Sequence, residues 1–450
     1  MPRRTSEALV EAKRFFSRAI ELDPNFALAH AGLADSLMLQ AEYSGAPMEL
    51  TLAQAEPVMA RALALEQNSA QLWASAAFIE WNKGELDRAE TMFQRALSLN
   101  PNFATARHWY TLLLRDSGRL DEALTQIQRA VALDPLSSVI RNVLGSTLEA
   151  QGRFPEAMDA YRRAVTNDPL RPGSFLSLAG LLAYALGKPA HAVPFAQKAM
   201  ELDPANPVLA SSLAWLHFDL GNYTDATGLL SVARQGGPAE YSVLGLSAFM
   251  NLTRGHQQGV VNDAERLLAS KSSYDNGIKP VRGLGLRLLR DYDLQIGRPD
   301  RALARYARAY PELVVTPSPT VDFSNWFVAA DLALILQKVG ERGSARVLLD
   351  RSEQIIRTLP RLGNRGYGIA DVQIHALRGD KVKALAALRD AEKASWRSDW
   401  RYFRDFDPNL ASIRNEPEFK AVFADIERDM ARQRAELAKR PKDAPLDLGP

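Results

Sequence analysis

The residues that most often carry out chemistry in enzymes are sparse in this chain and form no catalytic pattern. The sequence contains no cysteine, which excludes thiol nucleophiles, disulfides and zinc bound by cysteine. Neither HExxH nor GxSxG occurs, and the histidines lack the spacing of metal ligands. We therefore expect neither a metal nor a cofactor. The histidines, which we interpret as residues of helix faces, are His30, His108, His191, His217, His256 and His375.

Two glycine patterns resemble phosphate-binding loops only in part. The spacing between Gly180 and Lys188 differs from that of a P-loop, and Pro189 stands where a Ser or Thr is needed. Gly283 and Gly285 form a G-x-G pattern, but no predicted strand precedes them. We therefore predict no nucleotide site, and our main hypothesis is a protein that is not an enzyme.

Arginine is unusually dense between residues 282 and 308. A cluster of this kind could bind phosphate or an acidic peptide. The alternative, which we favour, is a solvated face whose charge is balanced by Asp291, Asp293 and Asp300. The arginines of the cluster are Arg282, Arg287, Arg290, Arg298, Arg301, Arg305 and Arg308.

The overall composition indicates a soluble protein without a polyanionic partner. Basic and acidic residues nearly balance, at 55 and 53, so the net charge is only +2. The N-terminus lacks the apolar core of a signal peptide, and no apolar run is long enough to span a membrane. We expect a cytoplasmic protein that binds neither nucleic acid nor membrane. A periplasmic location is the alternative if the chain is part of a membrane-anchored regulator.

Helical repeats supply the framework that must position any binding residues. Ala89, Phe93 and Ala96 share one face of a helix that ends before Pro101. The pattern recurs every 34 residues, and each copy ends at a proline, which cannot continue a helix. A glycine before each copy supplies the turn within the helix pair. The further copies are Ala123, Ile127, Ala130 and Pro135, then Ala157, Tyr161, Ala164 and Pro169, and the glycines are Gly84, Gly118 and Gly152.

A 34-residue period of helix pairs is the signature of tetratricopeptide repeats. One helix pair cannot bury its own apolar face, whereas a stack of pairs can. The 450 residues fit a stack of roughly ten such pairs. We therefore predict an all-α fold, a right-handed superhelical solenoid of tetratricopeptide repeats with essentially no strand.

Changes in the regularity of the pattern set the expected domain boundaries. The first copy lacks a partner helix, and a polar break follows the seventh repeat. A long charged helix near the C-terminus fits the polar cap that a solenoid needs. We expect a capping helix at 1–26, a regular array at 27–270 (repeats one to seven), a hinge at 271–282, a degenerate array at 283–395 (repeats eight to ten), a C-terminal capping segment at 396–440 and a disordered tail at 441–450.

The first helix of each repeat is expected to line the concave side of the superhelix. Its predicted lining is rich in aromatic and hydroxyl residues and poor in charge, which is typical of a groove for a protein or peptide. Trp81 and Trp215 could instead pack between adjacent helices, and this alternative is left open. The predicted binding residues, on repeats two to six, are Trp81, His108, Arg115, Asn142, Tyr184, Trp215 and Phe218.

Three segments carry a resemblance to a known family. AIELDPNFALAHAGLADSL, DSGRLDEALTQIQRAVALDPLSSVI and FDPNLASIRNEPEFKAVFADIE resemble bacterial tetratricopeptide proteins. More narrowly, they resemble the C-terminal arrays of bacterial winged-helix regulators and nucleotide cyclases. That resemblance implies a sensory or interaction arm. Because this sequence contains no winged helix or cyclase domain, it carries over no DNA-binding or catalytic role.

Two classes of function follow from this reading. The favoured hypothesis is an interaction scaffold, with a regulatory or sensory role, that binds a protein or peptide in the concave groove. The alternative is an enzyme with its site in the irregular region 240–325, or a piece of a larger bacterial regulator or cyclase. The sequence leaves the identity of the partner and the oligomeric state open.

Overall fold

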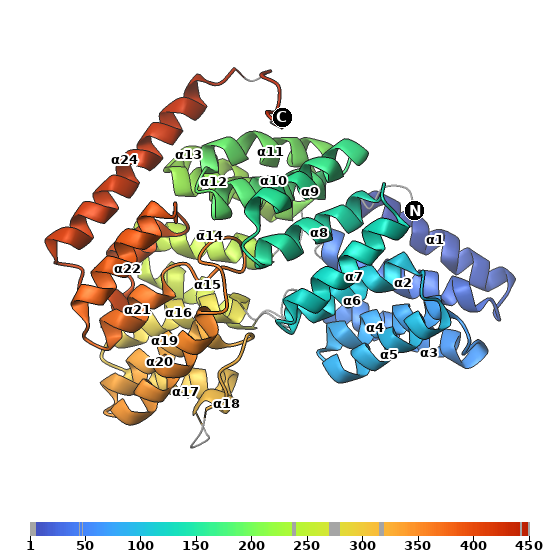
Figure 1. Ribbon diagram of the computed structural model, residues 1–450, viewed down its shortest axis with the longest axis horizontal. Coiled ribbons are helices and arrows are strands. Elements are labelled where there is room, and N and C mark those ends of the chain that lie inside the picture. The colour runs from blue at the N-terminus through green and yellow to red at the C-terminus, as the bar shows by residue number, and fades with distance from the viewer. Residues whose placement is uncertain are drawn as a thin grey trace.

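The fold is a stack of antiparallel helix pairs (Figure 1). The computed structural model describes residues 6–44, 46, 48–235, 240–269, 280–314, 319–441 and 443–448. Within these ranges the regular structure is helical throughout, and no strand occurs. The prediction of an all-α helical solenoid is confirmed.

In the part of the chain that the structure describes, ten helix pairs form the stack, and we call the first helix of each pair helix A. The first five pairs are α2 (Ala27–Ser44) with α3 (Met48–Leu65), α4 (Ala70–Lys83) with α5 (Leu86–Leu99), α6 (Ala104–Asp116) with α7 (Leu120–Leu133), α8 (Ser138–Ala150) with α9 (Phe154–Asn167), and α10 (Pro172–Gly180) and η1 (Leu181–Ala185) with α11 (Pro189–Leu202). The next five are α12 (Pro207–Leu220) with α13 (Tyr223–Gln235), α14 (Glu240–Thr253) with α15 (Gln257–Ala269), α16 (Pro280–Gln295) with α17 (Pro299–Ala309), α19 (Trp326–Lys338) with α20 (Arg342–Ile356), and α21 (Ala370–Leu377) with α22 (Lys381–Lys393). The remaining helices are α1 (Ser6–Leu22), α18 (Pro311–Val314), α23 (Trp400–Asp405), η3 (Pro408–Leu410) and α24 (Pro417–Lys439).

The repeating alanine and large residues are buried as the sequence pattern predicts. Ala89, Phe93 and Ala96 on α5 are all fully buried, and the equivalent residues of α7 and α9 are at most 2% exposed. Small side chains at these positions let paired helices approach closely, and the large one fills the space between neighbouring pairs. The equivalent residues of α1 are only half-buried.

The turn within each pair requires glycine at one position. Gly84, Gly118, Gly152, Gly187 and Gly221 all have φ between 63° and 88°, and the turn glycines of later repeats follow the same rule. This left-handed conformation costs glycine nothing but strains a residue that carries a Cβ atom. The number of residues between consecutive turn glycines therefore gives the length of each repeat.

Repeat five contains one extra residue, and a π-helical turn accommodates it. The turn glycines are 34 residues apart until Gly152, but Gly187 follows after 35. Helix A of this repeat changes from α-helix to π-helix at Leu181, and Leu186 N–H donates to Leu181 O. Lys188 N–H donates to Leu182 O, and Pro189 has no N–H, so neither residue donates to Tyr184 O. The carbonyl oxygen of Tyr184 instead accepts from a residue outside the helix, Gly363.

The C-terminal region folds back onto the middle of the array. Helix α24 packs not only on α22 of the last repeat but also on α11 and α12 of repeats five and six (Figure 1). Phe419, Val422, Phe423 and Ile426 are at most 2% exposed and share one apolar core with α9, α11 and α12. The expected capping helix therefore covers the last repeat and also joins it to the centre of the stack.

A buried ionic network fixes the segment that leads into α24. Arg290 of α16 has no solvent exposure and bonds the carboxylates of Asp331 and Asp407, the latter at 3.3 Å. The same guanidinium donates to Tyr402 Oη and Asn409 Oδ1, each at 3.2 Å. The favoured interpretation of the arginine cluster as a solvated face is wrong for Arg290. The sequence pattern could not predict the burial of Arg290, because the residue type is the same whether the side chain is buried or exposed.

The predicted hinge and the predicted disordered tail both lie partly outside the described residues. Of the predicted hinge at 271–282, residues 271–279 lie outside them, and 280–282 begin α16. Of the predicted disordered tail, residues 441 and 443–448 are described. Arg440, which precedes this tail, donates to the carbonyl oxygens of Ala444 and Pro445. Leu446 packs against the apolar core that α24 shares.

Candidate binding surface

The C-terminal ends of four consecutive A helices form one surface, which we call the A-helix edge. The edge comprises the ends of α6, α8, η1 and α12. On each of these helices we identify it by the residue three positions before the turn glycine. Carbonyl oxygens at the end of a helix have no partner within that helix and carry a partial negative charge. The edge therefore attracts N–H donors and cations. The marking residues are Arg115, Glu149, Tyr184 and Phe218, and Trp81 is their equivalent on α4.

The α20–α21 loop, residues 357–369, has a well-defined turn of its own. Tyr367 N–H donates to Pro360 O, Gly368 N–H to Arg361 O, and Gly366 N–H to Gly363 O. Arg361 bonds Asp371 at 2.6 Å and lies over the ring of Tyr367. A Cβ atom at Gly366 would lie 2.5 Å from two carbonyl oxygens of the loop, so only glycine fits there.

This loop binds the A-helix edge of repeats three to five through polar contacts. Gly363 N–H donates to the carbonyl oxygen of Tyr184 at 3.1 Å, and Asn364 N–H donates to Glu149 Oε1 at 2.9 Å. Arg365 Nη2 donates to Asp116 Oδ1 at 2.7 Å. Because two of these donors are backbone groups, the loop binds in the manner of an extended peptide.

Burial sets the electrostatics of this contact. Glu149 is 3% exposed, and burial raises the pKa of its carboxyl group, although the N–H of Asn364 and the hydroxyl of Tyr161 oppose the shift. Burial and the nearby charge of Arg115 lower the pKa of Arg365 to about 10, so its guanidinium stays charged at neutral pH. Asp116 and the end of the α6 dipole stabilise that charge.

A second segment covers the edge at repeat six. Arg401 Nη1 donates to Phe218 O at 3.1 Å and to Asp219 O at 2.7 Å, at the end of α12. Its guanidinium also lies over the Trp400 ring, which has no solvent exposure. Aromatic rings and α24 surround this contact.

Two of the predicted binding residues lie in the N-terminal part of the array. Trp81 is half-buried beside Phe78, with ring centroids 5.6 Å apart, and its buried indole N–H has no hydrogen-bond partner within the described ranges. His108 is 4% exposed. Neither belongs to the surface that the α20–α21 loop contacts.

Three predicted residues lie on or beside the contact with the loop. Arg115 donates to Ser146 Oγ at 2.6 Å, and its carbonyl oxygen accepts from Arg365 at 3.5 Å. Tyr184 supplies the carbonyl oxygen described above. Asn142 is half-buried on α8 and donates to Ser174 Oγ on α10 at 3.4 Å. Contacts of this kind link consecutive A helices across the surface.

Trp215 and Phe218 lie together at the boundary between repeats six and seven. Their ring centroids are 6.1 Å apart, and Trp215 also packs edge-on against Phe249 at 5.4 Å. The Trp215 indole donates to Ser242 O at 3.2 Å. Phe218 is 3% exposed. These contacts favour packing between helices over a role in the groove.

We expect Trp215→Ala to lower the free energy of unfolding by about 2 kcal/mol, because the half-buried indole loses its hydrogen bond and two ring contacts. Chemical denaturation checks this value. If unfolding is unchanged while partner binding falls, the side chain faces the groove and the packing interpretation is wrong.

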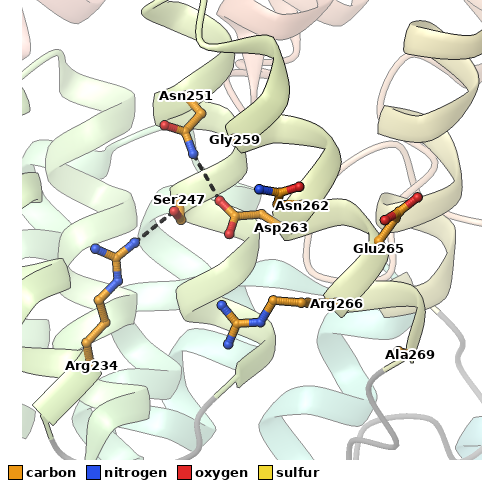
Figure 2. Close-up of a pocket in the computed structure, with 9 residues that line it drawn as sticks. All are labelled: Arg234, Ser247, Asn251, Gly259, Asn262, Asp263, Glu265, Arg266 and Ala269. Carbon is orange, nitrogen blue, oxygen red and sulfur yellow. Dashed lines mark hydrogen bonds between the residues drawn. The ribbon is translucent and has the colours of Figure 1, made fainter.

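A separate polar hollow of about 720 Å³ lies between α13, α14 and α15 (Figure 2). Arg234 donates to Ser247 Oγ, and Asn251 donates to Asp263 Oδ2. Glu265 at its rim is engaged with Arg305 of α17, at 3.4 Å. The hollow lies in the irregular region named in the enzyme hypothesis. It is a shallow surface depression, and its polar groups are partly paired with one another.

The residues that meet across the A-helix edge were not among the predicted binding residues. They are Asp116, Asn364 and Arg365. The available signal was the composition of the loop, because Gly363, Gly366 and Gly368 fall within six residues. Glycines so close together indicate a constrained turn.

Comparison with known families defines the class of protein. Residues 70–103, 112–172 and 183–242 match models of the tetratricopeptide repeat. The chain therefore contains tetratricopeptide repeats, which typically mediate protein–protein interaction in folds that are typically not enzymes. A search of curated protein sequences found no match. The narrower resemblance to arrays of winged-helix regulators and cyclases stays a prediction.

Several solved structures share the repeat fold. PilF of Pseudomonas aeruginosa is 21% identical, with a TM-score of 0.37 over 44% of this chain and 90% of that chain. YrrB, a tetratricopeptide protein with an unusual peptide-binding site, is 19% identical, with a TM-score of 0.30 over 41% and 95%. IFIT1 bound to Gppp-AAAA is 15% identical, with a TM-score of 0.36 over 77% and 67%. Similarity at this level concerns the fold and not the function.

Two further findings concern membranes and metals. Within the described ranges, no helix is long and apolar enough to cross a membrane. The same part of the chain contains no group of three or more His, Cys, Asp or Glu residues placed to hold a metal ion.

Proposed function

We propose that the protein is an interaction scaffold that binds an extended segment of a partner protein along the A helices of repeats two to six. The observation that carries this proposal is the α20–α21 loop. Its backbone already donates to Tyr184 O and Glu149 Oε1, as a bound peptide would. A surface that binds one extended segment by main-chain hydrogen bonds has the donors and acceptors to bind another.

The partly accessible A-helix residues support the same function. Leu112, Ser146 and Ser177 are half-buried on three successive A helices, and we call these three side chains the strip. The helices that present this strip are packed into a rigid stack. A pre-organised surface reduces the entropic cost of binding an extended partner. We propose a regulatory or sensory role for such a scaffold.

Affinity capture with the tagged full chain and a matched pair of variants tests this function. Ser177→Arg places a long charged side chain on the strip, whereas Thr91→Arg makes the same change on the exposed outer face of α5. We expect a partner, identified by mass spectrometry, to be retained by Thr91→Arg and reduced about tenfold or more by Ser177→Arg. Equal capture by both variants would refute binding along the A helices.

A further inference from the structure

We propose that the α20–α21 loop is an internal ligand, and that the partner presents a Gly-x-Arg segment that replaces it. This inference rests on the proposed function and specifies the chemistry of the partner. The site that reads the segment consists of Asp116, Glu149 and the carbonyl oxygen of Tyr184, one group from each of three consecutive repeats.

The arginine of the segment is specified by an acidic group at the end of a helix. Asp116 is 6% exposed and accepts from Arg365 at 2.7 Å, and the carbonyl oxygen of Arg115 points to the same guanidinium. The α6 dipole adds a partial negative charge at this point. A planar guanidinium can bond a carboxylate and a carbonyl oxygen together, which favours arginine over lysine.

The glycine of the segment is specified by space. Gly363 has φ of +90°, and a Cβ atom there would lie 3.2 Å from Glu149 Cγ and 3.4 Å from the ring of Phe154. A residue with a Cβ atom would be strained at this φ and would also crowd Glu149 and Phe154. Asn364, between the two, is exposed and contributes its N–H, so its side chain is less restricted. The recognised sequence is therefore glycine, any residue that has an N–H, and arginine.

The contact of the loop with the array is polar at residues 363–365 and apolar beside them. Gly363, Asn364 and Arg365 donate hydrogen bonds to groups of repeats three to five. Leu362 and Ile369 of the loop lie in the same apolar core as Trp400 and Phe423. The loop also keeps its own turn through internal hydrogen bonds. A partner segment would therefore replace the hydrogen bonds of residues 363–365, while α24 keeps its place in the core.

Peptide binding to the full chain tests this inference. The probe is a capped, labelled nine-residue peptide with the sequence of residues 360–368, PRLGNRGYG. In the wild-type chain the tethered loop competes at a high effective concentration, so binding should be weak. The double variant Arg365→Ala/Gly366→Val removes the internal guanidinium and breaks the turn of the loop. We expect it to bind the peptide at least about tenfold more tightly than wild type.

Matched controls separate specific recognition from general exposure. Arg357→Ala alters an exposed arginine of the same loop that pairs with Glu353, and should bind the peptide as weakly as wild type. Two changed peptides serve as further controls, one with alanine at the position of Arg365 and one with valine at the position of Gly363. Each should bind the double variant about tenfold less tightly than the original peptide. If the double variant fails to fold by circular dichroism, Arg365→Ala alone is used.

The inference is overturned if the double variant binds the peptide no better than wild type, or if the alanine peptide binds equally well. Either result leaves the proposed function standing whenever Ser177→Arg still reduces partner capture. If Ser177→Arg has no effect on capture, the proposed function fails whatever the peptide does.

Discussion

Replacement of Arg290 by alanine is expected to lower the free energy of unfolding by about 3–5 kcal/mol, because it removes a buried cation from a cluster of buried carboxylates. Asp331 and Asp407 are at most 1% exposed, and Arg290 contacts both. Burial alone would raise the pKa of Asp331, but Arg287 and Arg290 hold that pKa below its usual value. Asp331 is thus charged at neutral pH, and the loss of one of its two cations is costly.

Chemical denaturation of Arg290→Ala measures this loss. Arg298→Ala is the matched control, since that side chain is 57% exposed and pairs only with exposed Asp300 among the described residues. The control should unfold nearly as wild type does, because exposed ion pairs contribute little. If both variants unfold alike, the network around Arg290 does not hold the C-terminal segment.

Deletion of residues 412–450 is expected to make the protein aggregate, because α24 contributes to the core of repeats five and six as well as to the last repeat. Phe419, Val422, Phe423 and Ile426 are all buried. At about 1.5–3 kcal/mol each, four such side chains contribute on the order of 6–12 kcal/mol, comparable to the whole stability of a typical protein. The newly exposed apolar surface would promote association.

Light scattering and thermal melting of the truncated chain check this expectation. Arg432→Ala is the control on the same helix, because its side chain is 62% exposed and lies away from the core. It should melt and scatter as wild type does. A truncated chain that stays monomeric with an unchanged melting temperature would mean that α24 is an independent tail.

The repeat architecture could be predicted from the sequence because its causes are local and periodic. Gly84 and Gly118 must adopt a left-handed turn, and Ala89 and Ala96 must be small where two helices meet. Each requirement returns after 34 residues. The 35-residue interval that ends at Gly187 is also visible in the sequence. It indicates one extra residue in repeat five, which a π-helical turn accommodates.

The return of the C-terminal region could not be predicted in the same way. The pair formed by Arg365 and Asp116 joins residues 249 positions apart and occurs once, so no period reveals it. The contacts of the candidate site could not be predicted for the same reason. The helical phase placed Arg115 and Tyr184 on helices that the loop contacts, but the groups shown to accept its hydrogen bonds are their backbone carbonyl oxygens. A residue pattern describes side chains and says little about backbone acceptors.

A cysteine pair placed across the contact measures most directly whether the α20–α21 loop occupies the A-helix edge. The chain has no cysteine of its own, so Gly180→Cys with Asn364→Cys gives one unambiguous pair. A Cβ atom at position 180 would lie 3.4 Å from Asn364 Nδ2, which is close enough for oxidation or a short thiol cross-linker to join the two. The cross-link should form readily in the full chain and should abolish peptide binding until it is reduced or cleaved. If both thiols stay free and independently reactive under these conditions, the loop does not lie on the edge, and the account of an internally occupied scaffold is wrong.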